Sequence, residues 1–306
     1  MILITFVSIY KNCAIRGFLL KISIITTSYN YGQYISETIE SVIAQTYQDW
    51  EMIIVDDGSS DNSVSLIQSY CQKDQRIKLF SHENHVNKGL KETLRLGLKQ
   101  AQNDWIVFLE SDDSITPDYL EKKVAVIKKH PDVKFIINDV NLIGDDADKQ
   151  RLDKHFKIIN KVLKNKYQPL DLSSCLMKRN YIVTFSTVML NKGVLENVDF
   201  NSPVPPLLDY YLWAQIANKY KFYYLDEKLT NWRIHSDSYI KNARGFDAKS
   251  YLEFNLNKTR FICKGKNNLL YWYYCLYYRW NSIRKLILKI HLKDKSLCVL
   301  GKWYQW

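Results

Sequence analysis

Apolar runs of strand length alternate with segments of helical spacing through the first third of the chain. The strand-like runs cover residues 22–26, 50–55, 77–80 and 105–109, and the helical segments cover 35–43, 63–71 and 88–102. Because period-two and buried runs form strands while apolar positions three and four apart form helices, the order is strand, helix, strand, helix. This order predicts an α/β fold with a largely parallel sheet and helices on both of its faces.

Acidic residues gather where two of these runs end. Asp56 and Asp57 follow the second run, and Glu110-Ser111-Asp112-Asp113 follows the fourth. Ligands of such sheets bind beyond the carboxyl ends of the strands. Neighbouring carboxylates repel one another, and a divalent Mg²⁺ or Mn²⁺ that also bridges two phosphates would offset this repulsion. The alternative is a solvated acidic turn that caps a helix starting at Pro117.

Three stretches together resemble glycosyltransferase family two, the inverting enzymes with the GT-A fold. They are Ile22–Asn30, Ser41–Asp61 with the sequence Ile-Val-Asp-Asp-Gly-Ser-Ser-Asp at its end, and Phe108–Asp113 followed by Pro117-Asp118-Tyr119-Leu120. The resemblance covers residues 21–240 and is strongest up to 125. It implies transfer of a sugar from a nucleoside diphosphate, with UDP expected and dTDP or GDP as alternatives. The acceptor would be the hydroxyl of a saccharide or lipid-linked saccharide, in surface polysaccharide or glycoconjugate synthesis.

The resemblance also assigns roles to residues of the first half. Thr27, Tyr29 and Asn30 would bind the donor, with Thr27 and Tyr29 beside the nucleotide base and Asp57 hydrogen-bonded to it. Asp112 would bind the metal ion.

Further roles fall on the rest of the acidic turn. Glu110 stands where the family has Asp and would contact ribose or metal, while Ser111 and Asp113 would lie against the donor. The family's donor-binding Arg is displaced by one helical position to Arg95. One position turns a side chain by about 100° around the helix, so Lys88 or Lys91 is the alternative cation for the donor.

In the second half, Leu208-Asp209-Tyr210-Tyr211-Leu212-Trp213 resembles the segment that carries the general base. Asp209 would take the proton from the acceptor hydroxyl. An ordinary helix N-cap is the alternative for this residue. The segment around Arg233 and His235 resembles one that meets the diphosphate or completes the metal shell, so His235 joins Asp112 and Glu110 as a predicted metal ligand.

The positive charge lies almost entirely at the C-terminus. The net charge is +11, and the residues from Lys258 onward include eleven Lys or Arg and a single acid, Asp294. Tyr and Trp are frequent there as well, and this combination is typical of segments at membrane surfaces. It predicts a peripheral contact with the inner face of the membrane; a helical cap on the catalytic domain is the alternative.

Three segments follow from these patterns: an N-terminal leader over 1–20, a catalytic domain over 21–245 and a basic aromatic extension over 246–306. No run reaches the roughly 18 apolar residues of a spanning helix. The six cysteines form no Cys-x-x-Cys pair, which favours reduced thiols in the cytoplasm.

Two other functions remain open. One is a non-catalytic sugar-nucleotide binder of the same fold. The other is a nucleic-acid-binding protein, which would leave the acidic strand ends unexplained and is disfavoured.

Overall fold

The computed structural model describes residues 20–144, 146–164, 168–235, 246–263 and 268–293. The described chain forms two compact units, and each is considered by itself. The first comprises residues up to Leu170, Ile182–Glu196 and Lys221–His235, and the second comprises Asp171–Tyr181, Asn197–Tyr220 and the residues after His235. The predicted boundary at 245/246 adjoins residues 236–245, outside the described part, and stays a prediction.

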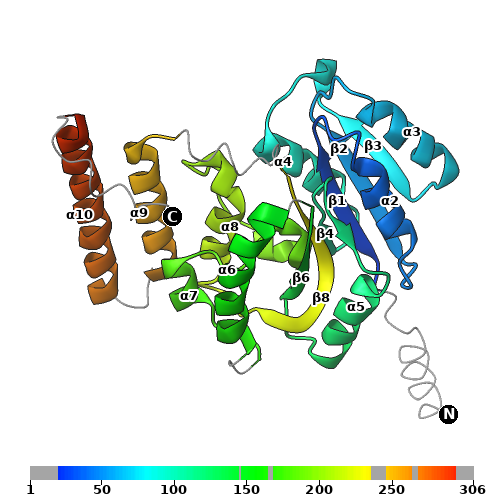
Figure 1. Cartoon of the computed structure of the whole chain (residues 1–306). Coiled ribbons are helices and arrows are strands. Elements are labelled where there is room, and N and C mark those ends of the chain that lie inside the picture. Colours follow the sequence, from blue (N-terminus) through cyan, green and yellow to red (C-terminus); the bar gives the residue numbers. More distant parts are fainter. Residues whose placement is uncertain (1–19, 145, 165–167, 236–245, 264–267, 294–306) are drawn as a thin grey trace, which may run out of the picture. The chain divides into compact units, whose positions relative to one another are not determined.

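An eight-stranded sheet forms the centre of the first unit, in the order β3-β2-β1-β4-β7-β6-β8-β5 (Figure 1). The strands are β1 (Ile22–Ser28), β2 (Trp50–Asp56), β3 (Ile77–Ser81), β4 (Trp105–Phe108), β5 (Ser114–Ile115), β6 (Phe135–Gly144), β7 (Val188–Asn191) and β8 (Tyr223–Ile234). β7 runs antiparallel to β4 and β6, and β5 runs antiparallel to β8, while the remaining neighbours are parallel. The sheet is therefore mixed and mostly parallel, which confirms the predicted α/β class.

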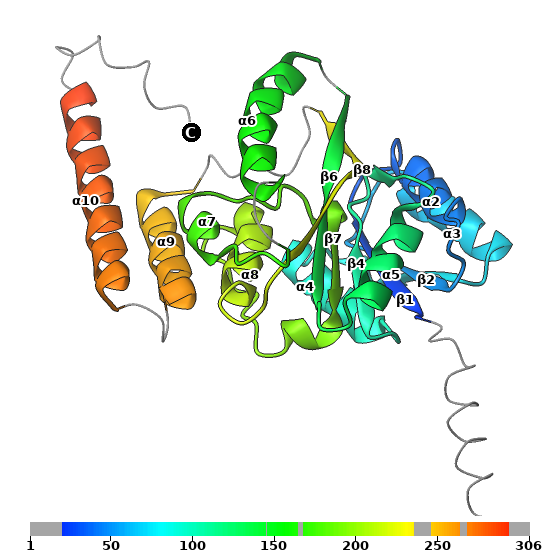
Figure 2. The same ribbon diagram turned by 90° about the horizontal axis from the view of Figure 1, so that it is seen from below.

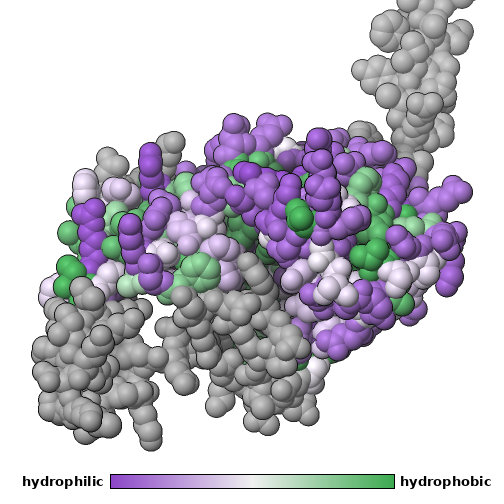
Figure 3. All heavy atoms as spheres, turned by 90° about the horizontal axis from the view of Figure 1, so that it is seen from above, coloured by the Kyte–Doolittle hydropathy of each residue, from purple (hydrophilic) through white to green (hydrophobic). Residues whose placement is uncertain are grey.

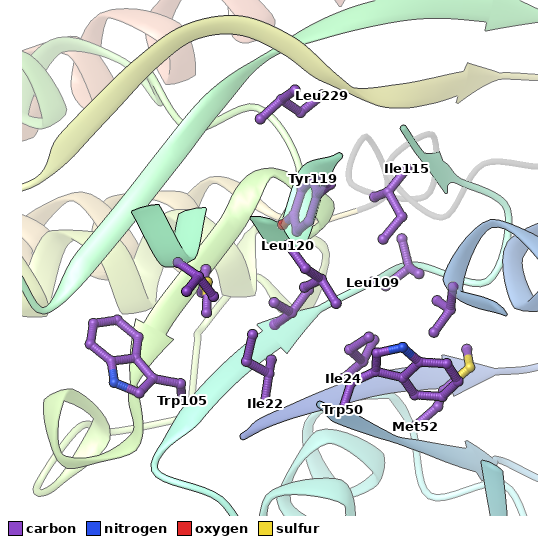
Figure 4. Packing of buried hydrophobic residues seen from close by; sticks show 14 of the residues in the cluster. Ile22, Ile24, Trp50, Met52, Trp105, Leu109, Ile115, Tyr119, Leu120 and Leu229 are labelled. Carbon is purple, nitrogen blue, oxygen red and sulfur yellow. The ribbon is translucent and has the colours of Figure 1, made fainter. Parts of the chain in front are cut away.

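Helices cover both faces of the strands that open the chain. The helices of the first unit are α2 (Ile35–Ile43), α3 (Ser63–Lys73), α4 (Leu90–Gln100), α5 (Tyr119–Lys129) and α6 (Asp146–Lys164). On one face, Ile22, Trp50 and Met52 pack with residues of α2, α3 and α5 in a buried cluster (Figure 4). α4 packs on the opposite face of β1 and β2. The two views of the ribbon show how these layers lie (Figures 1 and 2).

Gly97 lets α4 approach the sheet closely, so Gly97→Ala is expected to destabilise the first unit. A Cβ at Gly97 would lie 2.5 Å from Cγ2 of Ile25 on β1. Overpacking costs about 1–3 kcal/mol, and a 2.5 Å contact lies at the severe end of this range, about 2–3 kcal/mol. Because alanine gains roughly 1 kcal/mol in a helix, urea unfolding should show a net loss of about 1–2 kcal/mol. Lys99→Ala, an exposed change on the same helix, should stay within about 0.5 kcal/mol; equal stability of both variants would contradict the close packing.

The second unit is helical. It contains α7 (Ser173–Lys178), α8 (Leu208–Ile216), α9 (Ala248–Cys263) and α10 (Asn268–Lys293). Lys258 of α9 is buried and donates to the Tyr210 hydroxyl over 3.1 Å. Its ammonium also lies 4.7 Å from the centre of the Tyr210 ring and 5.3 Å from that of Tyr278 on α10. Burial lowers the pKa of Lys258 to about 7, and the rings stabilise its charged form.

Candidate active site

The turns that follow β1 and β2 are tied together. Asn30 has a positive φ of 55°, its amide donates to Oγ of Ser59 over 2.9 Å, and its Oδ1 accepts from the amide of Ser60 over 2.8 Å. Thr27 and Tyr29 flank this junction, and the Tyr29 side chain is 48% exposed. An exposed ring above the carboxyl ends of parallel strands can stack on a planar ligand, so the predicted base contact at Thr27, Tyr29 and Asn30 has a suitable position.

Asp57 is buried and holds the loop before α4. Its Oδ1 accepts from the amide of Lys88 over 2.7 Å, and its Oδ2 accepts from the amide of Gly89 over 2.9 Å. Nε2 of His82 lies 3.5 Å from Oδ1. These bonds give Asp57 a structural role, and its predicted hydrogen bond to the base stays a prediction. Lys88 itself is exposed, whereas Lys91 and Arg95 each form an ion pair with Glu92.

The acidic turn after β4 is supported by two hydroxyls of the 3₁₀ turn that precedes β7. Oδ2 of Asp113 accepts from Oγ of Ser186 over 2.6 Å and from Oγ1 of Thr184 over 3.2 Å. Thr184 also donates to the Glu110 carboxylate, and the Glu110 amide donates to Oγ of Ser186 over 3.0 Å. Sequence reasoning missed Thr184 and Ser186, since their only signal is the polar Thr-Phe-Ser-Thr start of an otherwise apolar run.

Asp113 is the most deeply buried acid of this turn. It is 1% exposed, and burial, followed by the negative charges of Asp112 and Glu110, raises its pKa well above the ordinary value. Its Oδ1 also accepts from the amide of Arg233 over 2.9 Å. Burial and the neighbouring carboxylates thus favour the neutral form of Asp113, while hydrogen bonds from Ser186 and the Arg233 amide oppose this shift.

The end of β8 lies beside the acidic turn because β5, which follows the turn directly, pairs with β8. Ser114 and Ile115 lie opposite Asn231 and Thr230, which places the residues before β5 beside those at the end of β8. Nε2 of His235 lies 2.9 Å from Oδ2 of Asp112. Asp112 and His235, distant in sequence, are thus neighbours in the fold, and their shared role as metal ligands stays a prediction.

Aromatic rings and an ion pair fix this corner. The ring of His235 lies 5.7 Å from that of Tyr31 and 5.0 Å from that of Tyr34, measured between centres. Nε of Arg233 donates to the carbonyl oxygen of Asp112 over 2.9 Å, and its Nη2 donates to Glu37. Glu37, in the first turn of α2, is a third residue that the sequence did not single out for the site.

Two atoms of this corner are candidates for binding a divalent cation. Ser111 Oγ and His235 Nδ1 are buried without a hydrogen-bond partner among the described residues, and oxygen ligands such as the Ser111 hydroxyl suit Mg²⁺ and Mn²⁺. In the described ranges, however, no three Asp, Glu, His or Cys side chains are grouped closely enough to hold a metal. Asp112 and His235 form a pair, and the inclusion of Glu110 with them stays a prediction.

Asp209 lies in the second unit, in the first turn of α8. The N-cap of α8 is Leu207, with no side-chain capping bond, so Asp209 is not the ordinary cap that its sequence position also allowed. One carboxylate oxygen accepts from Nδ2 of Asn180 over 2.7 Å. Burial raises the pKa of Asp209 to about 7. A carboxylate with such a pKa can accept a proton near neutral pH.

Sequence comparison gives a family and two informative relatives. The family described as glycosyl transferase family 2 matches residues 23–197. WfgD of Escherichia coli, a UDP-Glc:α-D-GlcNAc-diphosphoundecaprenol β-1,3-glucosyltransferase, is 33% identical over 64% of this chain and 69% of its own length. TuaG of Bacillus subtilis strain 168, a candidate teichuronic acid biosynthesis glycosyltransferase, is 29% identical over 72% of this chain and 82% of its own length.

Two solved structures share the fold. Residues 1–349 of TarS from S. aureus, in complex with UDP, superpose with a TM-score of 0.59 at 18% identity, over 81% of this chain and 67% of that one. The mannosyltransferase PcManGT of Pyrobaculum calidifontis, in complex with GDP-Man and Mn²⁺, gives a TM-score of 0.60 at 14% identity, over 91% and 76%. At these identities the likeness concerns the fold alone, which is that of GT-A glycosyltransferases.

Proposed function

Because this chain belongs to glycosyltransferase family 2, we propose that it transfers a sugar from a nucleoside diphosphate to an acceptor hydroxyl with inversion at the anomeric carbon. The observation that carries the proposal is the convergence of Asp112, Asp113, Arg233 and His235 at the carboxyl end of β4. This cluster joins negative charge, a guanidinium and an imidazole in the place where α/β sheets bind ligands.

Three residues of the cluster would act in donor binding. Asp112 and His235 would hold Mn²⁺ or Mg²⁺, with Glu110 as the third candidate ligand. The ion, when bound, supplies positive charge for the departing diphosphate. Arg233, fixed by Glu37 and the ring of Tyr34, is the cation that we assign to a diphosphate oxygen. Tyr29 would lie on the base, with Thr27 and Asn30 beside it.

The transfer is a single displacement. The carboxylate of Asp209 takes the proton of the acceptor hydroxyl, and the hydroxyl oxygen forms its bond to the anomeric carbon. The bond from that carbon to the diphosphate oxygen breaks on the opposite face, and the electron pair leaves with the diphosphate. Since the pKa of Asp209 is about 7, the protein can hold this base largely ionised at slightly alkaline pH.

UDP is the nucleotide we propose, and a lipid-linked saccharide is the acceptor, in synthesis of a surface polysaccharide. The support comes from the relatives: WfgD is named for UDP-Glc and a diphosphoundecaprenol acceptor, and TuaG for teichuronic acid biosynthesis. An acceptor of this kind places the enzyme at the inner face of the membrane. We propose that this attachment is peripheral. No helix within the described ranges is both long and apolar enough to span a bilayer.

A thermal-shift screen tests the donor. UDP-Glc, UDP-GlcNAc and GDP-Man are compared at equal concentration with Mn²⁺, and again with EDTA. A bound donor stabilises the protein by about 2.7 kcal/mol at a hundredfold excess over its Kd, so we expect the melting temperature to rise with a UDP-sugar and Mn²⁺ together. A larger rise in melting temperature with GDP-Man than with the UDP-sugars would overturn the proposal that UDP is the nucleotide of the donor. Shifts without any release of nucleoside diphosphate would favour the non-catalytic binder.

A further inference from the structure

α10 presents two apolar faces, and one of them packs inside the second unit. Tyr271, Tyr274, Cys275 and Tyr278 recur at helical spacing on this inner face. Cys275 is 4% exposed, and the hydroxyl of Tyr278 donates to the carbonyl oxygen of Met177 on α7 over 2.9 Å. α10 also packs along α9. These contacts fix which side of the helix faces its own unit.

The other side is apolar and exposed. We call it the outer face; it consists of Leu269, Trp272, Tyr273, Leu276, Tyr277, Trp280 and Ile283. Trp272 is 60% exposed, Leu276 63% and Trp280 64%. A helix that is apolar all round is normally buried on every side, yet none of the described residues covers this face. Exposed apolar stripes of this extent mark a contact with a partner or a membrane.

The charge of α10 indicates which partner. The helix sequence contains Arg279, Arg284, Lys285, Lys289 and Lys293 and no Asp or Glu. Arg279 and Arg284 are exposed beside the outer face. The space-filling view shows green apolar and purple hydrophilic residues next to one another on the surface (Figure 3). A second copy would bring like charges together, which disfavours self-association. Anionic lipid headgroups attract such a helix, and Trp and Tyr settle at the boundary between headgroups and acyl chains.

We propose that the outer face of α10 is a docking surface for anionic phospholipid, on which the helix lies parallel to the bilayer. Leu269, Leu276 and Ile283 would enter the acyl boundary, and Trp272 and Trp280 would lie at headgroup level. Arg279 and Arg284 would lie among the phosphates. This is the arrangement of an interfacial amphipathic helix. It goes beyond the proposed chemistry, since lipid binding through this face requires neither donor nor metal.

Vesicle flotation of the full chain tests the proposal. Wild type is expected to float with phosphatidylglycerol-containing vesicles and to remain below pure phosphatidylcholine vesicles. Each Arg or Lys near an anionic surface contributes about fivefold to binding, so Arg279→Gln with Arg284→Gln should weaken partitioning about thirtyfold. Trp272→Ser, Leu276→Ser and Trp280→Ser together should weaken it at least tenfold.

The control removes exposed apolar side chains elsewhere. Val86→Ser with Ile158→Ser, two exposed positions of the first unit, should float as wild type does. The far-ultraviolet circular dichroism and the donor-induced thermal shift show whether each variant is folded, so failure of lipid binding is separate from failure of the chemistry. Flotation of both α10 variants at the wild-type level would overturn the proposal. So would a wild type that ignores anionic vesicles and forms a dimer lost only in the outer-face variant, because that result makes a second copy the occupant.

Discussion

Asp209→Asn is expected to slow Mn²⁺-dependent release of nucleoside diphosphate by about 10²- to 10⁴-fold, the usual contribution of a general base. Asparagine keeps an oxygen that can accept the hydrogen bond from Asn180 but cannot take a proton. Donor binding should therefore persist, and the donor-induced thermal shift should match that of wild type.

The pH dependence gives a second measurement on the same residue. Because burial raises the pKa of Asp209 to about 7, kcat/KM of the wild type should rise with pH through 7 and level off above it; Asp209→Asn should lack this rise. The folded state binds the Asp209 proton more tightly than the unfolded state does, so its contribution to stability is lost as pH rises through 7. At pH 8 the variant should thus be at least as stable as wild type.

The matched control for Asp209 is Asp199→Asn, an exposed position in the same unit. It should keep nearly full activity and the wild-type pH profile. An Asp209→Asn protein with wild-type turnover, or with an unchanged acidic limb, would remove Asp209 from the mechanism.

Asp112→Asn is expected to lower turnover by about 10²- to 10³-fold, the typical effect of losing one group that stabilises developing charge. The substitution keeps the shape of the side chain but removes the negative charge that would hold Mn²⁺, so the Mn²⁺ concentration for half-maximal activity should also rise. It removes a like charge beside buried Asp113 as well, and the melting temperature without metal should not fall.

Asp118→Asn provides the comparison for Asp112, since within the described ranges the Asp118 carboxylate forms a surface pair with Lys122 and a bond with Thr116. Such pairs contribute about 0–1 kcal/mol, and activity and Mn²⁺ dependence should be unchanged. Full Mn²⁺-dependent turnover in Asp112→Asn would exclude Asp112 as a metal ligand.

Local patterns predict the strands and the parallel order of the first half of the sheet, but not how the strands of the second half pair. β1, β2 and β4 coincide with apolar runs in the sequence. These strands pair with one another in the sheet, and they are also close in sequence, with helices between them. β7 and β5 are antiparallel insertions, and β5 has only two residues; such pairings depend on distant partners that no local pattern records. β8 extends over twelve residues, although only its first residues form an apolar run.

The site shows the same limit at the level of side chains. The acids after β4 stand out because like charges crowd one turn. Thr184 and Ser186 contact that turn from far away in the chain, and Glu37 binds the neighbouring Arg233. Polar residues before a strand or in the first turn of a helix usually serve as caps or surface groups. The family resemblance supplied Asp209 and His235. The hydrogen bond between His235 and Asp112 could come only from the pairing of β5 with β8.

That pairing has a consequence for synthesis of the chain. The Asp113 carboxylate accepts hydrogen bonds from Thr184, Ser186 and the amide of Arg233. During synthesis these three donors are missing until the ribosome has added the residues that carry them. The strands β1 to β4 can associate early, as neighbours along the nascent polypeptide do. The acidic turn has all of its hydrogen-bond donors only after β8, which carries Arg233, has been synthesised. A fragment that ends at residue 197, the limit of the family match, lacks β8 and should therefore aggregate when expressed alone.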